Sequence, residues 1–119
     1  MVIIKGTWRA DTLNGTAAAD AIRGFDGNDQ MTGNGGNDVF IFGTDSRSGK
    51  RSTDTITDYQ VGRDFIGLEG GAGVRSIVDI GSAIVITLLG DGDRIVIQGA
   101  PLNVPDIRIL DNPPSFDLV

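Results

Sequence analysis

A nine-residue pattern occurs four times without a gap between residues 6 and 41. Each block has Gly at its first position, Asp at its sixth and an apolar residue at its eighth. The sixth-position acids are Asp11, Asp20, Asp29 and Asp38, and the eighth-position residues are Leu13, Ile22, Met31 and Phe40. Self-similarity at a fixed period is typical of solenoids, in which neighbouring repeats stack and bury a continuous core. The repeat therefore predicts a wound, repetitive fold for this part of the chain.

One block has the composition of a six-residue glycine-rich turn followed by a three-residue strand with one inward side chain. Two blocks then form one coil, so that the eighth position fills a narrow core and the loops stack two blocks apart. The expected fold class is all-β: a short parallel β-roll (a β-solenoid) followed by an antiparallel β cap. The alternative is an ordinary β-sandwich punctuated by Gly-Asp turns. Four in-phase blocks with a matching apolar position favour the roll.

The amino-acid composition limits the chemistry that this chain can carry out. It has no Cys and no His, and fifteen of its sixteen acidic residues are Asp. Zinc sites built from nitrogen and sulfur, and nucleophiles that depend on Cys or His, are therefore excluded. We expect that the chain is not an enzyme. Its net charge of −6 argues against nucleic acid as a partner. No apolar run approaches the ~18 residues that span a bilayer, so membrane insertion is not expected.

Oxygen ligands remain available to a metal, and they suit a hard cation such as Ca²⁺. Stacked loops would bring carboxylates from two blocks and several turn carbonyls around one gap. We expect two core sites that pair acids two blocks apart, Asp11 with Asp29 and Asp20 with Asp38. The turn carbonyls expected to complete the two shells are those of Gly24, Asp26, Gly27, Gly33, Gly35 and Gly36. The pattern thus predicts Ca²⁺ as the cofactor.

The four blocks resemble the RTX (hemolysin-type calcium-binding) repeat, whose nonapeptide is G-G-x-G-x-D-x-U-x. The third and fourth blocks carry Gly-Asn-Asp at residues 27–29 and 36–38. The first and second blocks have Arg9 and Ala18 where the family usually has its fourth-position Gly. The resemblance implies a calcium-binding β-roll in a secreted, extracellular protein that is exported by the type I machinery of Gram-negative bacteria.

Two further acids keep the nine-residue rhythm after residue 41. Asp45 and Asp54 both fall at the fourth position of the next two windows. If the roll continues for one more turn, Asp45 stacks beside the third loop and Asp54 beside the fourth. Our hypothesis is that both add closing calcium sites, as aspartates just after the roll do in related RTX enzymes. The alternative is that they are solvated loop acids near Arg47, Lys50 and Arg51.

The chain is expected to have three parts: the roll over residues 1–52 (repeats at 6–41), a β cap over 53–111 and an extended tail over 112–119. Short β-rich runs predict cap strands at 54–59, 64–68, 76–80, 83–89, 94–98 and 106–110. The turn Gly90-Asp91-Gly92-Asp93 is expected to be a polar hairpin tip in preference to a second calcium loop. Residues 53–68 resemble the segment that follows the roll in RTX proteases and alginate epimerases.

The last residues follow Pro113-Pro114, which rules out a continuing helix or central strand. An acid followed by terminal apolar residues, Asp117-Leu118-Val119, is similar to the uncleaved type I secretion signal of RTX proteins. The alternative is a frayed polar terminus with a few apolar residues. The type I secretion machinery is thus an expected partner.

The leading functional hypothesis is a C-terminal folding and secretion module of an RTX protein, which folds on binding Ca²⁺ after export. Before export, the acids repel one another, and four short blocks bury too little apolar surface to offset chain entropy. Outside the cell, at roughly millimolar calcium, ion binding and folding become one event. The alternative is a polysaccharide-binding accessory module of an extracellular enzyme such as an alginate epimerase. An anionic glycan would need a basic face, and the clustered cations are Arg47, Lys50 and Arg51.

Overall fold

The computed structural model describes residues 2–7, 9–24, 27–42, 52–60, 62–68, 73–88, 93–98, 107 and 109–111. This part of the chain consists of strands and turns and contains no helix, so the expected all-β class is confirmed. Accordingly, the described residues include no helix that is long and apolar enough to cross a membrane. Asp26, Asp45, the cluster at residues 47–51, the turn residues 90–92 and the tail at 112–119 lie outside the described residues.

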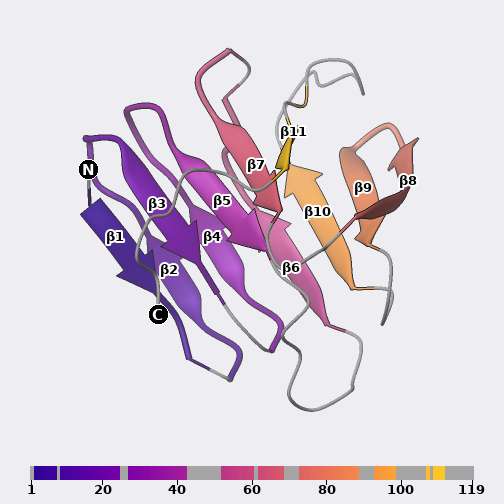
Figure 1. Ribbon diagram of the computed structural model, residues 1–119, viewed down its shortest axis with the longest axis horizontal. Helices are drawn as coiled ribbons and strands as arrows, with labels where there is room; N and C mark the ends of the chain where they lie inside the picture. Colours follow the sequence, from indigo (N-terminus) through magenta and orange to yellow (C-terminus); the bar gives the residue numbers. More distant parts are fainter. Residues whose placement is uncertain are drawn as a thin grey trace.

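The strands form two sheets (Figure 1). The five-stranded sheet has the order β1 (Val2–Lys5), β3 (Asp20–Arg23), β5 (Val39–Phe42), β7 (Phe65–Leu68) and β11 (Ile109–Asp111). The six-stranded sheet has the order β2 (Thr12–Asn14), β4 (Gln30–Thr32), β6 (Thr53–Ile56), β10 (Arg94–Gln98), β9 (Ala83–Leu88) and β8 (Val74–Asp79). Through β7, successive strands alternate between the two sheets, as a chain wound into coils requires.

Residues two blocks apart are neighbours in parallel strand pairs. Leu13 of β2 pairs with Met31 of β4, and Ile22 of β3 pairs with Phe40 of β5. Ile22, Met31 and Phe40 are fully buried in one hydrophobic cluster, and Leu13 is partly buried against it. The predicted role of the eighth position as core is thus confirmed. Because side chains alternate along a strand, this inward residue of each block determines which side of the three- or four-residue strand points into the core.

Parallel pairing continues beyond the repeat. β6 pairs with β4, β7 with β5, β10 with β6 and β11 with β7, all in parallel. Their inward residues Ile56, Ile66, Ile95 and Ile97 extend the same core cluster. Antiparallel pairing among the described strands joins β9 to β10 and β8 to β9. Strand direction therefore does not change at residue 53, where the cap was expected to begin.

The six strands expected after residue 53 each overlap an observed strand; β10 (Arg94–Gln98) has the expected ends, and the other five have shifted ends. The first ends at Ile56, because Asp58 turns to bind the backbone of Gly33 and Asn34. β9 and β10 are antiparallel neighbours, as the predicted hairpin requires. The last strand, β11, was expected in an antiparallel cap, but it pairs in parallel with β7.

Candidate metal centre

The sixth-position aspartates of the repeat, together with Asp54 and Asp64 from beyond it, stack into two rows, which we call the aspartate ladders. The first ladder consists of Asp11, Asp29 and Asp54, and the second of Asp20, Asp38 and Asp64. In each ladder, Oδ1 of an acid accepts a hydrogen bond from the backbone N–H of the acid one coil earlier. These distances are 2.9 Å for Asp11 to Asp29, 3.0 Å for Asp20 to Asp38, 2.9 Å for Asp29 to Asp54 and 3.0 Å for Asp38 to Asp64. The two expected pairings, Asp11 with Asp29 and Asp20 with Asp38, are therefore in direct contact.

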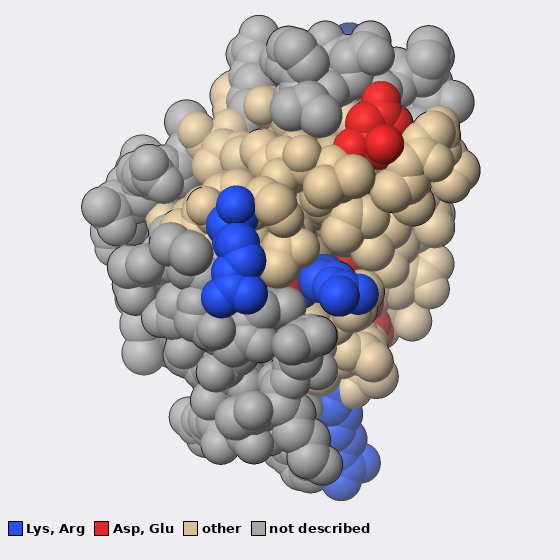
Figure 2. All heavy atoms as spheres, turned by 90° about the vertical axis from the view of Figure 1, so that its right-hand side faces the viewer, with Lys and Arg blue, Asp and Glu red and all other residues tan. Residues whose placement is uncertain are grey.

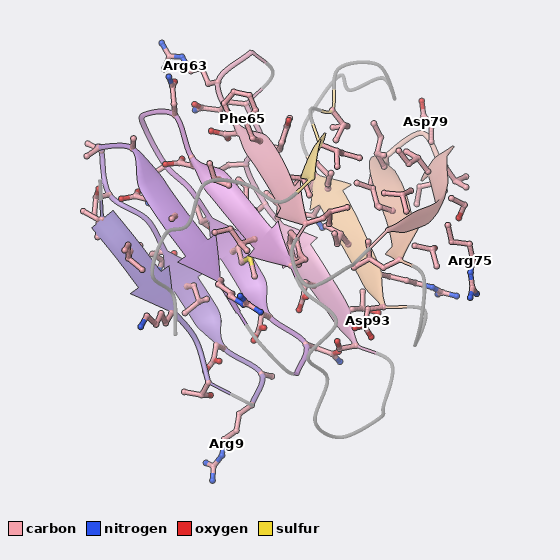
Figure 3. The ribbon with its side chains drawn as sticks, in the orientation of Figure 1. Arg9, Arg63, Phe65, Arg75, Asp79 and Asp93 are labelled. Atoms are coloured by element: carbon pink, nitrogen blue, oxygen red, sulfur yellow. The ribbon has the colours of Figure 1, made fainter. Side chains whose placement is uncertain are left out.

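The ladders lie at opposite ends of the strands. Figure 3 places Arg9 and Asp93 at one edge of the molecule and Arg63 at the other edge. Arg9 belongs to the loop of Asp11, and Arg63 immediately precedes Asp64. The Arg9 side chain points away from the ribbon into solvent (Figure 3), so it does not enter the space between stacked loops.

The first and second blocks form the first coil, and the third and fourth blocks form the second coil. Close stacking of their loops depends on the fourth-position glycines of the second coil. Gly27 has a φ of 91°, and a Cβ there would lie 2.6 Å from the carbonyl oxygen of Arg9. Gly36 has a φ of 83°, and its Cβ would lie 2.5 Å from the carbonyl oxygen of Ala18. Arg9 and Ala18 occupy the same position in the first coil. The first two blocks can depart from the Gly pattern, because it is the glycines of the second coil that lie against the backbone of the first coil.

The other expected carbonyl donors also lie in these loops. The first-position glycines Gly24 and Gly33 contact the acids of their own blocks, and a Cβ on either would collide with Oδ2 of Asp29 or Asp38. Gly35 is less confined, because its Cβ would lie 3.4 Å from the carbonyl oxygen of Ala17. The structure therefore places five of the six named carbonyl residues beside the ladders, and Asp26 lies outside the described residues. Their role as metal ligands stays a prediction.

Two carboxylate oxygens in the ladders are buried without a hydrogen-bond partner. Asp29 is 2% exposed and Asp38 is 0% exposed, and Oδ2 of each accepts no hydrogen bond from the described residues. In contrast, Oδ2 of Asp11, Asp20 and Asp64 each accepts the backbone N–H of the residue four positions earlier. A buried polar atom that lacks a partner is rare in a folded protein and calls for an explanation such as an ion.

The missing bond at Asp38 has an identifiable cause. The N–H four positions before Asp38 belongs to Asn34, and it donates instead to Oδ2 of Asp58 at 2.7 Å. Oδ1 of Asp58 accepts the N–H of Gly33 at 2.8 Å. Asn34 adopts a φ of 62°, a left-handed conformation that Asn tolerates better than most residues. Asp58 thus holds the fourth loop in a shape that leaves Asp38 with an open oxygen.

Four of the six ladder acids, Asp29, Asp38, Asp54 and Asp64, are hard to ionise in this environment. Burial raises the pKa of Asp29 to about 8, although the N–H of Asp11 opposes the shift, and the nearby charge of Asp54 adds to it. Burial likewise raises the pKa of Asp38 to about 7 and that of Asp54 to about 7. The pKa of Asp64 is raised by the same cause. A bound cation would relieve both the desolvation and the mutual repulsion of these carboxylates.

Asp54 occupies a different position in the aspartate ladders, which we call a rung, from the one predicted. It contacts Asp29 of the third block, whereas the nine-residue frame had placed it beside the fourth loop. The stacking offset is 18 residues within the repeat but 25 residues between Asp29 and Asp54, because the connection between β5 and β6 is longer than one block allows. The rung beside Asp38 is filled by Asp64 at an offset of 26 residues.

Asp64 and Asp58 are the site residues that the sequence analysis missed. A usable signal was present for Asp64, because an acid two positions before an inward apolar residue recurs in Asp54-Thr55-Ile56 and Asp64-Phe65-Ile66. The same spacing occurs in Asp93-Arg94-Ile95, and Oδ1 of Asp93 accepts the N–H of Ser52 at 2.9 Å. No comparable local signal marks Asp58.

The carboxylates alone do not make a complete metal centre. Within the described ranges, no group of three or more acidic, His or Cys side chains is arranged to hold a metal ion. An ion at the ladders would therefore need backbone carbonyl oxygens as well, which agrees with the all-oxygen set expected from the loops. The donor chemistry, the buried open oxygens and the raised pKa values fit a hard cation.

Comparison with known proteins agrees with this chemistry for the repeat. The model of the family described as RTX calcium-binding nonapeptide repeat (4 copies) matches residues 5–40, the segment that holds the four blocks. This match supports the RTX resemblance over that segment and Ca²⁺ as its ligand. A similar solved structure is the solution structure of the AlgE6R3 subunit from the Azotobacter vinelandii mannuronan C5-epimerase. The two chains are 21% identical with a TM-score of 0.30, and the alignment covers 86% of this chain and 79% of that chain. No curated protein matches the chain.

Proposed function

We propose that this chain is a calcium-binding β-roll module whose folding is coupled to ion binding after export from the cell. The observation that carries the proposal is the pair of open oxygens on Asp29 and Asp38, both buried and both without a hydrogen-bond partner. Leaving a buried polar atom unsatisfied costs about 1–3 kcal/mol, and more for a charged group. An ion bound at these oxygens removes that penalty in the folded state.

The coupling to folding follows from the number of buried acids. Five of the described aspartates are buried: Asp20, Asp29, Asp38, Asp54 and Asp64. Burial raises the pKa of four of them, Asp29, Asp38, Asp54 and Asp64, so at neutral pH the metal-free fold must either ionise these four groups in a poorly hydrated, mutually repulsive setting or take up protons. The unfolded chain has no such requirement. Calcium therefore shifts the equilibrium toward the fold by binding the folded state alone.

The parallel roll and the antiparallel extension are proposed to fold as one unit. Ile84 and Ile86 of β9, which pairs antiparallel with β10 and β8, share one hydrophobic cluster with Met31 and Phe40 from the repeat. The first ladder also crosses from the repeat to Asp54. Both contacts join the C-terminal strands to the repeat, where calcium is proposed to bind, and this supports a single folding transition.

The module is proposed to be non-catalytic and to serve as the C-terminal folding and secretion module of an extracellular RTX protein. The repeat match at residues 5–40 supports this role, since RTX repeat proteins are typically secreted by the type I machinery of Gram-negative bacteria. The tail at residues 112–119 is the candidate secretion signal. Fusing the chain, with and without this tail, to a reporter in a type I-competent host tests this part. Equal export of the two fusions would reject the tail as signal.

Polysaccharide binding remains the alternative function. It would require a basic face for an anionic glycan. On the face shown in Figure 2, the described Lys and Arg side chains are scattered and do not merge into one basic patch. The clustered cations Arg47, Lys50 and Arg51 lie outside the described residues.

Isothermal titration of the full chain with CaCl₂ and, separately, MgCl₂ tests the proposed function directly. We expect heat of binding and a defined stoichiometry with calcium, and no comparable binding of magnesium, which demands a smaller octahedral site. Absence of calcium binding at millimolar concentrations would reject the proposal.

A further inference from the structure

The first coil differs from the second in how its ladder acids are held. Thr7 and Thr16 stand at the second position of the first and second blocks. The Thr7 hydroxyl donates to the Asp11 carboxylate, at 3.1 Å from Oδ1 and 3.0 Å from Oδ2, and its N–H donates to Oδ2 at 2.6 Å. The Thr16 hydroxyl donates to Oδ1 of Asp20 at 2.9 Å, and its N–H donates to Oδ2 at 2.7 Å. Both oxygens of each first-coil acid are therefore satisfied within the block.

Each threonine is itself fixed by its own turn. The Oγ1 of Thr7 accepts the N–H of Arg9 at 3.1 Å, and the Oγ1 of Thr16 accepts the N–H of Ala18 at 3.1 Å. A hydroxyl that accepts from the backbone two residues on is a common turn device for Ser and Thr. Because its lone pair is engaged by the turn, the hydroxyl proton is directed to the carboxylate. The same geometry in two blocks makes it a repeated feature of the first coil.

Burial alone does not separate the two coils. Asp20 and Asp38 are both 0% exposed, yet Asp20 has partners for both oxygens and Asp38 has an open Oδ2. For this pair, the backbone N–H at the second position of the block accounts for the difference, because that of Thr16 donates to Oδ2 of Asp20. The second-coil blocks have Phe25 and Asn34 there, and neither carries a hydroxyl like the one that donates from Thr16 to Oδ1 of Asp20. The N–H of Asn34 is taken by Asp58.

We propose that Thr7 and Thr16 satisfy Asp11 and Asp20 in place of a metal ion, so that calcium is bound through Asp29 and Asp38 and not through the first-coil acids. This inference rests on the proposed calcium-binding function and narrows its ligand set. The two hydrogen-bond donors of each threonine satisfy the oxygens of a first-coil carboxylate, as a bound ion satisfies those of a second-coil carboxylate. The first coil thus forms an ion-free end of the roll, on which the second-coil loops stack.

Calcium stoichiometry of asparagine variants tests the inference, because Asn keeps the side-chain shape and removes the charge. The variants are Asp11→Asn, Asp20→Asn, Asp29→Asn and Asp38→Asn, each in the full chain and each checked by circular dichroism at saturating calcium. We expect Asp29→Asn and Asp38→Asn each to bind one ion fewer than the parent chain. Asp11→Asn and Asp20→Asn keep the parent stoichiometry.

Loss of an ion in Asp11→Asn or Asp20→Asn would overturn the inference and leave the proposed function intact. Absence of calcium binding by the parent chain would instead reject the proposed function. Thr16→Val provides a second route if Asp20→Asn does not fold, with Thr12→Val, exposed on β2, as the matched control. We expect Thr16→Val to keep the stoichiometry and to change calcium affinity less than twofold, while its unfolding midpoint falls below that of Thr12→Val. An ion lost in Thr16→Val would show that the hydroxyl is a ligand and would also overturn the inference.

Discussion

The backbone N–H of Asp29 donates a 2.9 Å hydrogen bond to Oδ1 of Asp54, a residue that follows it by 25 positions. Asp29 belongs to the repeat and Asp54 to the segment after it. The bond has the same form as that between Asp11 and Asp29, so the ladder crosses a long connection without losing its geometry. The aspartate ladder therefore extends beyond the repeat.

Replacing Asp54 tests whether this rung contributes to ion binding. Asp54→Ala removes a buried carboxylate next to Asp29 and leaves the Asp29 N–H without its acceptor. We expect a loss of about 1–3 kcal/mol of stability in calcium and weaker calcium binding. Asp79→Ala, at an exposed position, is the control for charge. Calorimetry that gives the parent stoichiometry and affinity would remove Asp54 from the site.

Asp58 should control the metal site without being part of a ladder. Asp58→Ala frees the N–H of Asn34, which can then bond to Oδ2 of Asp38 as the equivalent N–H groups do in the first coil. We expect calcium affinity to fall by about tenfold, equivalent to about 1.4 kcal/mol, with the fold retained in excess calcium. Asp58→Asn, which keeps one acceptor oxygen, should have a smaller effect. Equal affinity in all three proteins would contradict this role.

Glycine substitutions separate backbone strain from loop stacking. Gly27 and Gly62 both have positive φ, at 91° and 83°, but only a Cβ at Gly27 would meet another loop. Gly62→Ala should cost about 1–2 kcal/mol, the usual penalty for a left-handed residue. Gly27→Ala should cost more, because the Arg9 carbonyl lies in the way. Equal losses in chemical denaturation with calcium would mean that the loops are not tightly stacked.

The stability of the metal-free chain should depend on pH in a stated direction. The pKa of Asp29 is raised from 3.8 to about 8 and that of Asp38 from 3.8 to about 7. Between pH 3.8 and about 8 the folded chain binds more protons than the unfolded chain. The stability of the metal-free chain is therefore greatest near pH 3.8 and falls as the pH rises. In chelator, β structure should therefore increase when the pH is lowered from about 8 to about 5. A decrease over that range would contradict the assignment of buried acids.

The repeat was predictable from sequence because its period is short and uninterrupted. Position eight, seen in Ile22 and Phe40, carries one apolar side chain per block, and this alone sets the coil and the core. The pairing of Asp20 with Asp38 followed from the same arithmetic. Both features follow from the regular nine-residue period, which four consecutive blocks make visible in the sequence.

The later rungs were not predictable in the same way. The longer connection before β6 shifts the register, so counting in nines misplaced Asp54 and missed Asp64. The roles of Thr7 and Asp58 depend on which carboxylate accepts the backbone N–H at the second position of a block. The three-dimensional shape of the loop determines that acceptor. A sequence pattern marks such residues only as polar turn positions.

Far-ultraviolet circular dichroism of the full chain at neutral pH tests the central claim most directly. The spectrum is recorded in chelator, then after addition of millimolar calcium, and in parallel after addition of the same concentration of magnesium. The account predicts little β signal in chelator, a cooperative gain with calcium and no such gain with magnesium. A full β spectrum in chelator that calcium leaves unchanged would contradict the coupling of folding to calcium.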